Sequence, residues 1–517
     1  MSLQLVSFDT DRVKDYLFAT SVLGDIREAS ALLDNLNRKI GETIREICPG
    51  LSPDDVIYAA GGSALVLLPD DATAKRAVRA IEAFYRGATI TASITGVHIP
   101  MSPEDLRQRF GEKVRQAGFL LRQRKAEKGN PRTLPAAPYM RFCDACGCLP
   151  AAHRDRERDE LVCRACWIKR AHRGEARRTL WDRLIQVTEP HRGTPVAPAG
   201  WDDLLARTVG NVDYRLHRRP DDFSSIAASS RRPGYIALIY ADGNNMGRIV
   251  QGLETPRSYR SLAHGVDDLL ARVTYCSLMK QVREHPGRPL FELLMAGGDD
   301  LMLVCAADCA FPVALDLAEG FEKYSSPLVE SLGAKSQAIS LSVGVVVARE
   351  DFPIAAMRDL ATSLQRRAKR RSFEADGEGA IDFMVVTGPG SQNVDRIREE
   401  VLTEKGFVLR PREGRYLLTR RPYLASELRR LLDDAMLLKG AGFPPGQLQT
   451  MFEAVFESSN QASLAAVQAL GRLRAEPRRM LLEFFRHGGC DILYPWRKAN
   501  GYRDTALVDL VEIYPFV

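Results

Sequence analysis

The segment Met295–Val304 (MAGGDDLMLV) constrains the fold more than any other part of the chain. Two glycines and two aspartates stand between the apolar runs Phe291–Met295 and Leu301–Cys305, and this pattern predicts a β-hairpin with a tight turn. The turn would hold Asp299 and Asp300 at an exposed tip. Paired carboxylates on a rigid tip suit Mg²⁺ or Mn²⁺, although an ordinary Gly-Gly-Asp turn has the same sequence.

A buried strand upstream ends in a further carboxylate. Residues Tyr235–Tyr240 (YIALIY) are continuously apolar and lead into ADGNNMG, so Asp242 is expected at the end of the strand. Gly243 and Gly247, which follow, would let a phosphate approach the backbone.

The segments around the hairpin alternate between helical and strand patterns. Helices are expected at about 259–284, 313–332 and 354–371, and strands at 338–347 and 381–386. The resulting order β-α-β-β-α-β-α-β is that of a ferredoxin-like palm with extensions. In such a palm the end of the first strand lies beside the hairpin tip, so Asp242 would meet Asp299 or Asp300 over one pair of metal ions.

The N-terminal part of the chain repeats this pattern loosely. Residues 5–20, 29–33 and 58–68 predict a first palm, whose hairpin has Gly61-Gly62 followed by Ser63 and Ala64, where the second palm has two aspartates. Asp9 and Asp11 follow an apolar run as Asp242 does, so a metal site in the first palm remains an alternative. The sequence favours one palm without metal ligands and one with them.

Four cysteines predict a zinc site. Cys143-x-x-Cys146 and Cys163-x-x-Cys166 are separated by sixteen residues, the spacing of two knuckles around a tetrahedral Zn²⁺. Four thiolates leave no open coordination position, so the role is structural. A redox C-x-x-C pair is the alternative, and the nearby Cys148 and His153 are possible substitute ligands. The other cysteines are dispersed, which fits a reducing cytoplasm: residues 48, 276, 305, 309 and 490.

These motifs carry a family resemblance. YADGNNMG (240–247), AGGDDLMLV (296–304) and the helical Ala368-Lys369 resemble the polymerase/cyclase palm of the large subunits of type III CRISPR effectors. They resemble more distantly the nucleotide-cyclising palm with its GGDEF hairpin. The degenerate first palm and the cysteine-rich insert agree with the narrower resemblance.

The resemblance and the patterns together imply an α+β chain with two ferredoxin-like palm domains. The expected divisions are a degenerate first palm (1–130), a zinc-binding insert with four cysteines (131–187), a linker (188–232), a catalytic second palm (233–390) and a C-terminal all-α domain (391–517). The last domain is expected from helical spacing within 422–438, 445–457 and 461–485.

The resemblance also implies a function: conversion of ATP to cyclic oligoadenylate with release of pyrophosphate, in antiviral defence and activated by target RNA. Asp242, Asp299 and Asp300 would hold two Mg²⁺ or Mn²⁺ ions, and Lys369 would contact the triphosphate. A basic helix terminus that complements the macrodipole is the alternative for Lys369. The expected nucleotide-binding residues are Gly243, Asn244, Asn245, Gly247, Gly297, Gly298 and, at the acceptor site, Ser63.

Two departures from the family pattern stand out. Asn244 occupies a position that is usually acidic, so metal affinity is expected to be lower. The eight histidines include no His-Asp pair, and no nuclease activity of the His-Asp type is expected. Two rival functions stay open: a stand-alone palm synthetase that makes another cyclic nucleotide, and a catalytically silent scaffold of an RNA-guided complex.

Composition limits the partners. No apolar run approaches the roughly 18 residues of a membrane span, and no secretory signal is recognisable, so a cytoplasmic protein is expected. The net charge is only +6, but basic residues cluster on both sides of the cysteine insert. Such clusters suit binding to a phosphate backbone, and a solvated helix face is the alternative. By resemblance, the partners are guide RNA, target RNA and a small helical subunit on the C-terminal domain. The clusters comprise Arg122, Arg124, Lys125, Lys128, Arg132, Arg164, Lys169, Arg170, Arg173, Arg177 and Arg178.

Overall fold

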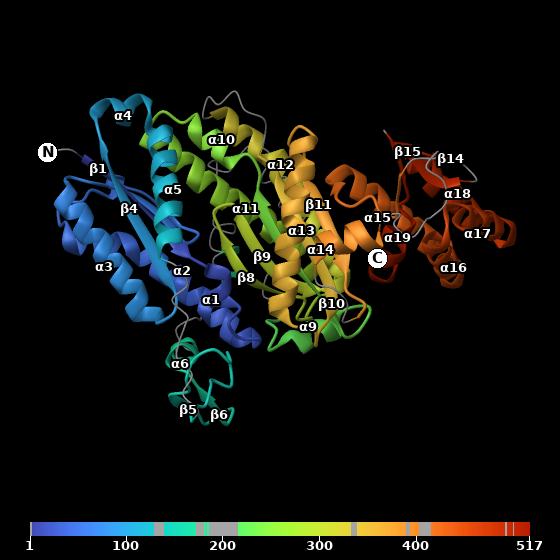
Figure 1. Ribbon diagram of the computed structural model, residues 1–517, viewed down its shortest axis with the longest axis horizontal. Coiled ribbons are helices and arrows are strands. Elements are labelled where there is room, and N and C mark those ends of the chain that lie inside the picture. Colours follow the sequence, from blue (N-terminus) through green and yellow to red (C-terminus); the bar gives the residue numbers. More distant parts are fainter. Residues whose placement is uncertain are drawn as a thin grey trace.

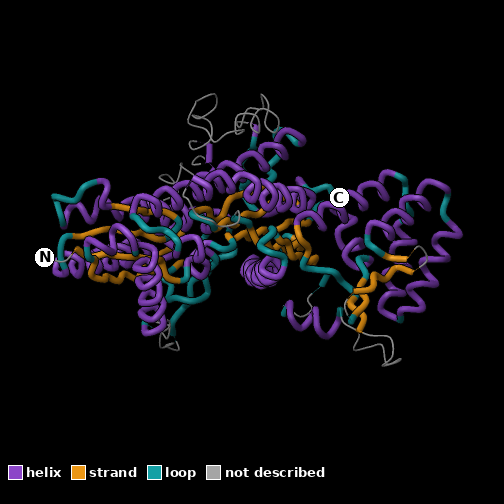
Figure 2. The backbone as a smooth tube through the Cα atoms, turned by 90° about the horizontal axis from the view of Figure 1, so that it is seen from above, coloured by secondary structure: helices purple, strands orange, loops and turns teal. Residues whose placement is uncertain are grey.

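The computed structural model describes residues 3–128, 139–171, 180–181, 184–185, 216–331, 339–388, 393–402, 415–491, 494–499 and 501–517. Most of the expected linker, residues 188–215, lies outside these ranges. The first palm, the second palm and a C-terminal domain follow one another along the molecule, and a cysteine insert projects to one side (Figure 1). Seen from above, the strands of the two palms and of the C-terminal domain form separate groups along the long axis (Figure 2).

The first palm is a four-stranded antiparallel sheet in the order β2-β3-β1-β4. Its strands are β1 (Leu3–Asp11), β2 (Val56–Ala60), β3 (Ser63–Leu68) and β4 (Ser93–Met101). Helices α2 (Leu23–Ile47) and α3 (Asp71–Thr89) connect them, and Asp70 caps α3 by accepting from Thr73 N at 2.8 Å.

Helices cover both faces of the first palm's sheet. In β1, Val6 and Phe8 belong to the main core with α2 and α3, whereas Leu5 belongs to a second core under α5 (Phe110–Glu127). This alternation is the period-2 burial expected of a strand with two covered faces. The short helices α1 (Val13–Leu17) and α4 (Pro103–Gln108) complete the domain.

The second palm has the same topology, as the sequence predicted. Its core strands are β7 (Tyr235–Gly243), β8 (Phe291–Gly297), β9 (Asp300–Ala306) and β10 (Leu341–Arg349). The sheet order β13-β11-β10-β7-β9-β8 adds β11 (Ala380–Val385) and β13 (Tyr423–Leu424) beside β10. The domain's helices are α9 (Phe223–Ser229), α10 (Met246–Gln251), α11 (Pro256–Glu284), α12 (Ala310–Ser331) and α13 (Ile354–Glu374), with a short 3₁₀ turn at Ala307–Cys309.

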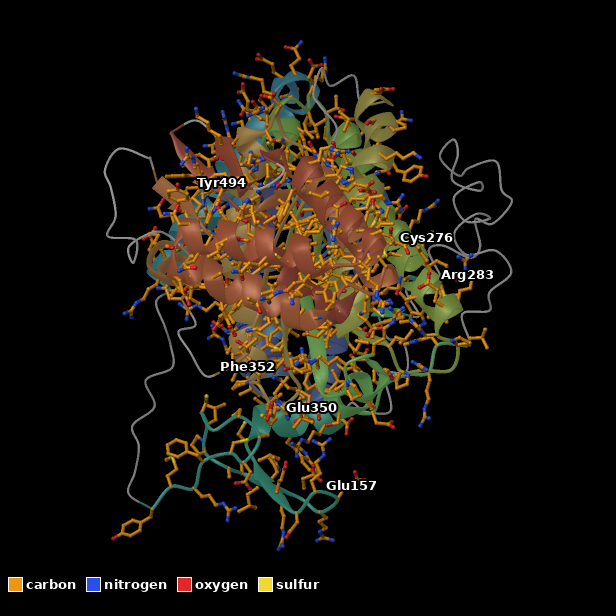
Figure 3. The ribbon with its side chains drawn as sticks, turned by 90° about the vertical axis from the view of Figure 1, so that its right-hand side faces the viewer. Glu157, Cys276, Arg283, Glu350, Phe352 and Tyr494 are labelled. Atoms are coloured by element: carbon orange, nitrogen blue, oxygen red, sulfur yellow. The ribbon has the colours of Figure 1, made fainter. Side chains whose placement is uncertain are left out.

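The cysteine insert projects below the first palm (Figure 1) and is marked by Glu157 in Figure 3. It consists of the strands β5 (His153–Asp155) and β6 (Glu160–Val162) and the helix α6 (Arg164–Ala171). A buried ion pair attaches it to α2, because Arg170 donates to Asp25 at 2.9–3.2 Å. Within the insert, Arg170 also donates to Asp155 at 2.7 Å.

The C-terminal domain is mainly helical but is not all-α. Its long helices are α15 (Ala425–Gly440), α16 (Pro445–Glu457), α17 (Ser459–Arg472) and α18 (Ala475–His487). A four-stranded sheet in the order β12-β16-β15-β14 packs with them; its strands are β12 (Arg415–Leu417), β14 (Cys490–Asp491), β15 (Tyr494–Ala499) and β16 (Tyr502–Asp504). The short segments are α14 (Val394–Arg396), a π-helical turn at Ile397–Val401, α19 (Leu507–Ile513) and a 3₁₀ turn at Tyr514–Phe516.

The sheet corrects the all-α expectation. Its strands are two to six residues long, too short for a period-2 pattern to be recognised in the sequence. Tyr494 marks this part of the domain in Figure 3. Within the described residues, none of the helices combines the length and apolarity that crossing a membrane requires.

Candidate active site between the palms

Asp242 lies at the end of β7, the strand between β9 and β10. Two side chains of α13 hold its carboxylate: Gln365 Nε2 donates to Asp242 Oδ2 at 3.0 Å and Lys369 Nζ at 2.5 Å. Gln365 and Lys369 are four residues apart and therefore lie on the same face of the helix. Lys369 Nζ also donates to Gly243 O at 2.9 Å, so its cation lies at the strand end.

The hairpin turn brings Asp299 to the same place. Gly297 pairs with Asp300, which leaves Gly298 and Asp299 as a two-residue turn. Gly298 has φ +64° and Asp299 is not in the left-handed region, as in a type II′ turn. A Cβ on Gly243 would lie 2.6 Å from Asp299 Oδ2, so only glycine allows this carboxylate to rest against the end of β7.

The three aspartates crowd one another. Burial and then the charge of Asp242 raise the pKa of Asp299 to about 6. Burial, Asp242 and Asp299 raise the pKa of Asp300 well above its usual range, and Tyr240 donates to Asp300 Oδ1 at 3.0 Å. Clustered carboxylates that disfavour each other's charge are a donor set that fits a hard divalent cation.

The three aspartates are neighbours, but their carboxylate oxygens do not all converge as the ligand atoms of one metal ion would. Among the described side chains, only the four insert cysteines form a group of three or more metal-ligating residues whose ligand atoms all lie within 4.8 Å of one another. The ion pair with Lys369 holds Asp242 toward α13.

The hairpin tip is half-buried, which corrects the expectation of an exposed tip. The hairpin of the first palm packs against it, backbone to backbone: a Cβ on Gly297 would lie 2.5 Å from Gly61 Cα. Gly111 N of α5 also donates to Leu253 O at 2.8 Å, so the palms meet along a second line. The two Gly-Gly turns thus form part of the interface between the palms, and the role of Gly297 and Gly298 in nucleotide binding stays a prediction.

Asn244 has a different role from the one expected. Its side chain is 1% exposed; its amide nitrogen donates to Ser340 Oγ at 2.8 Å and to Ser372 Oγ at 3.1 Å, and its oxygen accepts from Ser342 Oγ at 2.7 Å. With both ends of the amide engaged in the core, the side chain turns away from the aspartates. The Asn244 side chain therefore has a role in the core that the sequence did not predict, and a contact of this residue with nucleotide stays a prediction.

The neighbouring positions of the strand-end motif remain open to a ligand. Asn245 adopts φ +64° and begins α10, and nothing lies within 4 Å of a Cβ on Gly247. Their role in nucleotide binding therefore stays a prediction.

The first palm does not reproduce the carboxylate cluster. Ala60 pairs with Ser63, so its two-residue turn is Gly61-Gly62, with φ +61° and +84°, as in a type I′ turn. In the strand register, Ser63 therefore corresponds to Asp300, and Gly62 corresponds to Asp299. Aligning the two Gly-Gly pairs by sequence had placed Ser63 one residue earlier, at the position of Asp299. Ser63 Oγ donates to Ala60 O at 3.4 Å.

Asp9 and Asp11 of the first palm form ion pairs with two lysines. Lys125 Nζ lies 2.6 Å from Asp9 Oδ2 and 3.3 Å from Asp11 Oδ1, and Lys128 lies 3.6 Å from Asp11. Ser93 and Thr95 donate to Asp11 at 2.8–2.9 Å. Two lysines thus balance the charges of the two strand-end aspartates of the first palm.

Several described members of the basic clusters beside the insert bond to groups of the protein itself. Arg124 pairs with Glu82, and Lys169 donates to Tyr16 O at 2.7 Å. Arg122 and Arg164 are exposed. The remaining members of the clusters lie outside the described residues: Arg132, Arg173, Arg177 and Arg178.

A cavity of about 360 Å³ opens between the palms beside the aspartates. Lys14 of α1, which sequence reasoning missed, reaches into it: its Nζ lies 3.5 Å from the centroid of the Tyr240 ring in the other palm. Burial lowers the pKa of Lys14, and the charges of Asp300 and Asp242 oppose that shift. Its segment, DRVKDYLF, follows a strand-end carboxylate just as ADGNNMG does, which is the signal that could have drawn attention to it.

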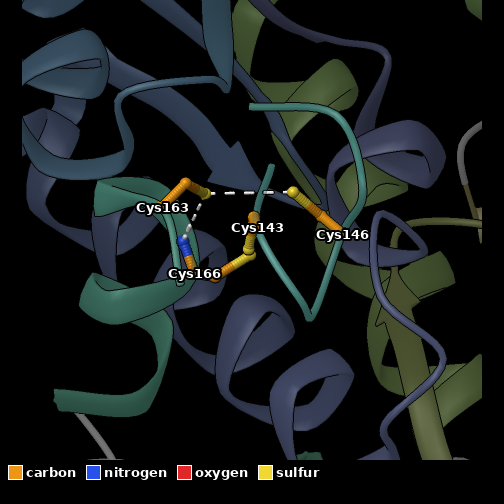
Figure 4. Close-up of side chains that lie close together, drawn as sticks. All are labelled: Cys143, Cys146, Cys163 and Cys166. Carbon is orange, nitrogen blue, oxygen red and sulfur yellow. Dashed lines mark hydrogen bonds between the residues drawn. The ribbon is translucent and has the colours of Figure 1, made fainter. Parts of the chain in front are cut away.

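The four cysteines of the insert converge as predicted (Figure 4). Cys146 Sγ and Cys163 Sγ are 3.9 Å apart, and Cys166 N donates to Cys163 Sγ at 3.4 Å. Cys148 is exposed, and the His153 ring stacks on Trp167, so neither belongs to the cluster. Four thiol sulfurs at one point fit a structural Zn²⁺.

Comparison with known proteins identifies the second palm. Residues 235–375 match the family model of the Cas10/Cmr2 second palm domain. Among curated proteins there is no match.

The solved structure of Csm1 from T. onnurineus is similar over the whole chain, with a TM-score of 0.60 and 17% identity, covering 100% of this chain and 69% of that one. The Csm1–Csm4 cassettes in complex with cA4 (TM-score 0.60, 14% identity) and with pppApApA (TM-score 0.59, 15% identity) are each matched over 99% of this chain and 69% of theirs. The chain covers 54% of the protein matched in the cassette with pppApA.

At these identities the likeness establishes a shared fold. Residues 235–375 are thus a second palm domain of the Cas10/Cmr2 family, in a chain with the fold of Csm1, as the resemblance to type III CRISPR large subunits predicted.

Proposed function

We propose that the chain is a nucleotidyltransferase that joins ATP into cyclic oligoadenylate at the second palm and releases pyrophosphate, as part of type III CRISPR defence. The observation that carries this proposal is the convergence of Asp242, Asp299 and Asp300 beside the cavity between the palms. Structures of the same fold have been solved with cA4 and with pppApApA, which supports adenylate chemistry.

In the proposed reaction, a ribose 3′-oxygen forms a bond to the α-phosphorus of a second ATP, and the bond to the β-phosphate breaks. Asp242, Asp299 and Asp300 would hold Mg²⁺ or Mn²⁺, which supplies charge that favours the alkoxide and offsets the leaving pyrophosphate. The remaining contributions come from the protein itself.

Each aspartate is held in place by its neighbours. Gln365 orients Asp242, Tyr240 orients Asp300, and Gly243 leaves room for Asp299. Lys369 has its ammonium at the strand end, where it can turn from Asp242 to a phosphate once a metal ion takes over the carboxylate.

The proposal includes assembly with other subunits and with RNA. The similar Csm1 structures with cA4 and with pppApApA were solved together with Csm4. The C-terminal helices expose apolar side chains of the kind that a helical subunit would cover: Met436, Leu437, Phe456, Leu464 and Val467. Guide RNA and activation by target RNA rest on the family resemblance.

The test is incubation of the chain with labelled ATP and Mg²⁺ or Mn²⁺, with and without candidate RNA, followed by mass analysis of the products. Cyclic oligoadenylate from the wild-type chain, and none from Asp299→Ala with Asp300→Ala, is the expected result. Unchanged turnover in that double variant would refute the proposal. Activity without RNA or partners would favour a stand-alone synthetase. Absence of product under every condition would favour a catalytically silent scaffold.

A further inference from the structure

Lys14 connects the first palm to the carboxylates of the second. It lies on α1, a helix of only five residues, and its side chain is half-buried. Its Nζ lies 3.5 Å from the centroid of the Tyr240 ring, and the Tyr240 hydroxyl donates to Asp300 at 3.0 Å. A cation over an aromatic face is favourable, but it does not neutralise the charge.

Lys14 differs from the other lysines near the two strand ends. Lys125 lies 2.6 Å from Asp9, Lys128 3.6 Å from Asp11 and Lys369 2.5 Å from Asp242. Lys14, by contrast, makes no ion pair within 4.0 Å with any side chain in the described part of the chain. Holding an ammonium in a half-buried place without a carboxylate partner is costly, and an anionic ligand would offset that cost.

The helix that carries Lys14 is fixed from two sides. Arg358 of the second palm donates to Lys14 O at 3.2 Å and to Asp15 at 3.4 Å. On the other side Lys169 of the cysteine insert, itself 1% exposed, donates to Tyr16 O at 2.7 Å. These contacts hold the backbone of α1 beside the cavity, and the Tyr240 ring is the contact of the Lys14 ammonium itself.

We propose that Lys14 binds a phosphate of the nucleotide held between the palms, so that the first palm supplies a cation to the active site of the second. The proposal rests on the proposed function, because it takes ATP as the nucleotide. Among the described residues that line the cavity, Lys14 and Arg12 are the cations, whereas Asp9, Asp15, Asp34 and Asp300 are acidic. A triphosphate needs cations within reach in such a site.

Binding measurements test this role independently of turnover. The affinities of a non-hydrolysable ATP analogue with Mg²⁺, and of adenosine, are measured by calorimetry for the full chain and for Lys14→Met, Lys14→Arg and Lys39→Met. Lys39 is an exposed lysine of α2 and serves as the matched control. Lys14→Met should bind the analogue about 10- to 100-fold more weakly, as expected for one lost charged hydrogen bond, and adenosine as well as the wild type does. Lys14→Arg should keep part of the affinity, and Lys39→Met all of it.

Two results would overturn the assignment. Wild-type affinity for the analogue in Lys14→Met would exclude a phosphate contact, and an equal loss of adenosine binding would indicate a merely structural role. A wild-type chain that binds the analogue but makes no product would refute the proposed function alone, because the Lys14 comparison would still stand on binding. A wild-type chain that binds no analogue would overturn both proposals.

Discussion

The contact between the two hairpin tips predicts a severe effect of Gly297→Ala. A Cβ at this position would lie 2.5 Å from Gly61 Cα and 3.0 Å from Gly61 N, and both are backbone atoms that cannot turn aside. Ordinary contact begins at 3.4 Å, so the tips must separate by about 0.9 Å. Gly297 is outside the left-handed region, so alanine adds no backbone strain and the variant tests the contact alone.

The size of the effect follows from the position of Gly297, two residues before Asp299 in the turn. Displacing a catalytic group by about 1 Å costs on the order of 100-fold in rate, and overpacking costs about 1–3 kcal/mol of stability. We therefore expect Gly297→Ala to lose about 100-fold in cyclic oligoadenylate formation, as measured by mass analysis, while the chain stays folded by thermal unfolding.

Gly118→Ala is the matched control. Gly118 lies in α5, and nothing lies within 4 Å of a Cβ built on it. Alanine is a better helix former than glycine, so this variant should keep full turnover and be unchanged or slightly more stable. Wild-type turnover in Gly297→Ala would mean that the tip contact does not position Asp299, and the reasoning from this interface would be wrong.

Three further predictions concern the carboxylates, the cysteines and a buried histidine. Asp299→Ala with Asp300→Ala should abolish product but leave thermal stability unchanged or higher, because the pKa of both carboxyls is raised by burial and mutual repulsion; a large loss of stability would contradict this. The chain should contain about one Zn²⁺ by metal analysis, and Cys143→Ser should lower thermal stability more than turnover per folded molecule; zinc-free protein would contradict the assignment. Burial lowers the pKa of His217 to about 4 from 6.5, so the unfolded state binds the proton first and stability should fall as the pH drops from about 6.5 to about 4. His217→Phe should reduce that fall in thermal melts, and an unchanged pH dependence would exclude His217 as a cause.

The sequence was sufficient for the features that depend on local pattern. The continuous apolar run of β7 and the glycines of the hairpin predicted the strand end and the turn, and a ferredoxin-like topology brought them together. The cysteine spacing predicted the cluster in the insert. These signals lie within a few residues of one another, so no knowledge of distant contacts was needed.

The features that the sequence did not predict depend on distant contacts. Asn244 is engaged by three serines that lie about 100 residues or more away, so its motif alone gave no sign of a core role. The hairpin tip of the second palm packs on that of the first palm, and Asp299 rests against Gly243, more than 50 residues earlier in the chain. The position of Lys14 beside the active site is apparent only from its contact with Tyr240, which lies more than 200 residues further along the chain.

Comparison of the two palms shows which part of the site distinguishes them. Helix α5 follows β4 in the first palm as α13 follows β10 in the second, and both helices direct a lysine to the strand-end aspartate. Lys125 lies 2.6 Å from Asp9, and Lys369 lies 2.5 Å from Asp242. The aspartate–lysine pair is therefore common to both palms and is not sufficient evidence of catalysis.

The difference lies in the hairpin turn. The type I′ turn of the first palm has φ +84° at Gly62, a conformation that favours glycine, whereas the turn of the second palm places Asp299 outside the left-handed region. Ser63 at the position of Asp300 then removes the second carboxylate. With both strand-end aspartates of the first palm, Asp9 and Asp11, paired with Lys125 and Lys128, that palm has no surplus negative charge for a divalent cation. The second palm retains two carboxylates beyond its aspartate–lysine pair, and the proposed metal chemistry follows from that surplus.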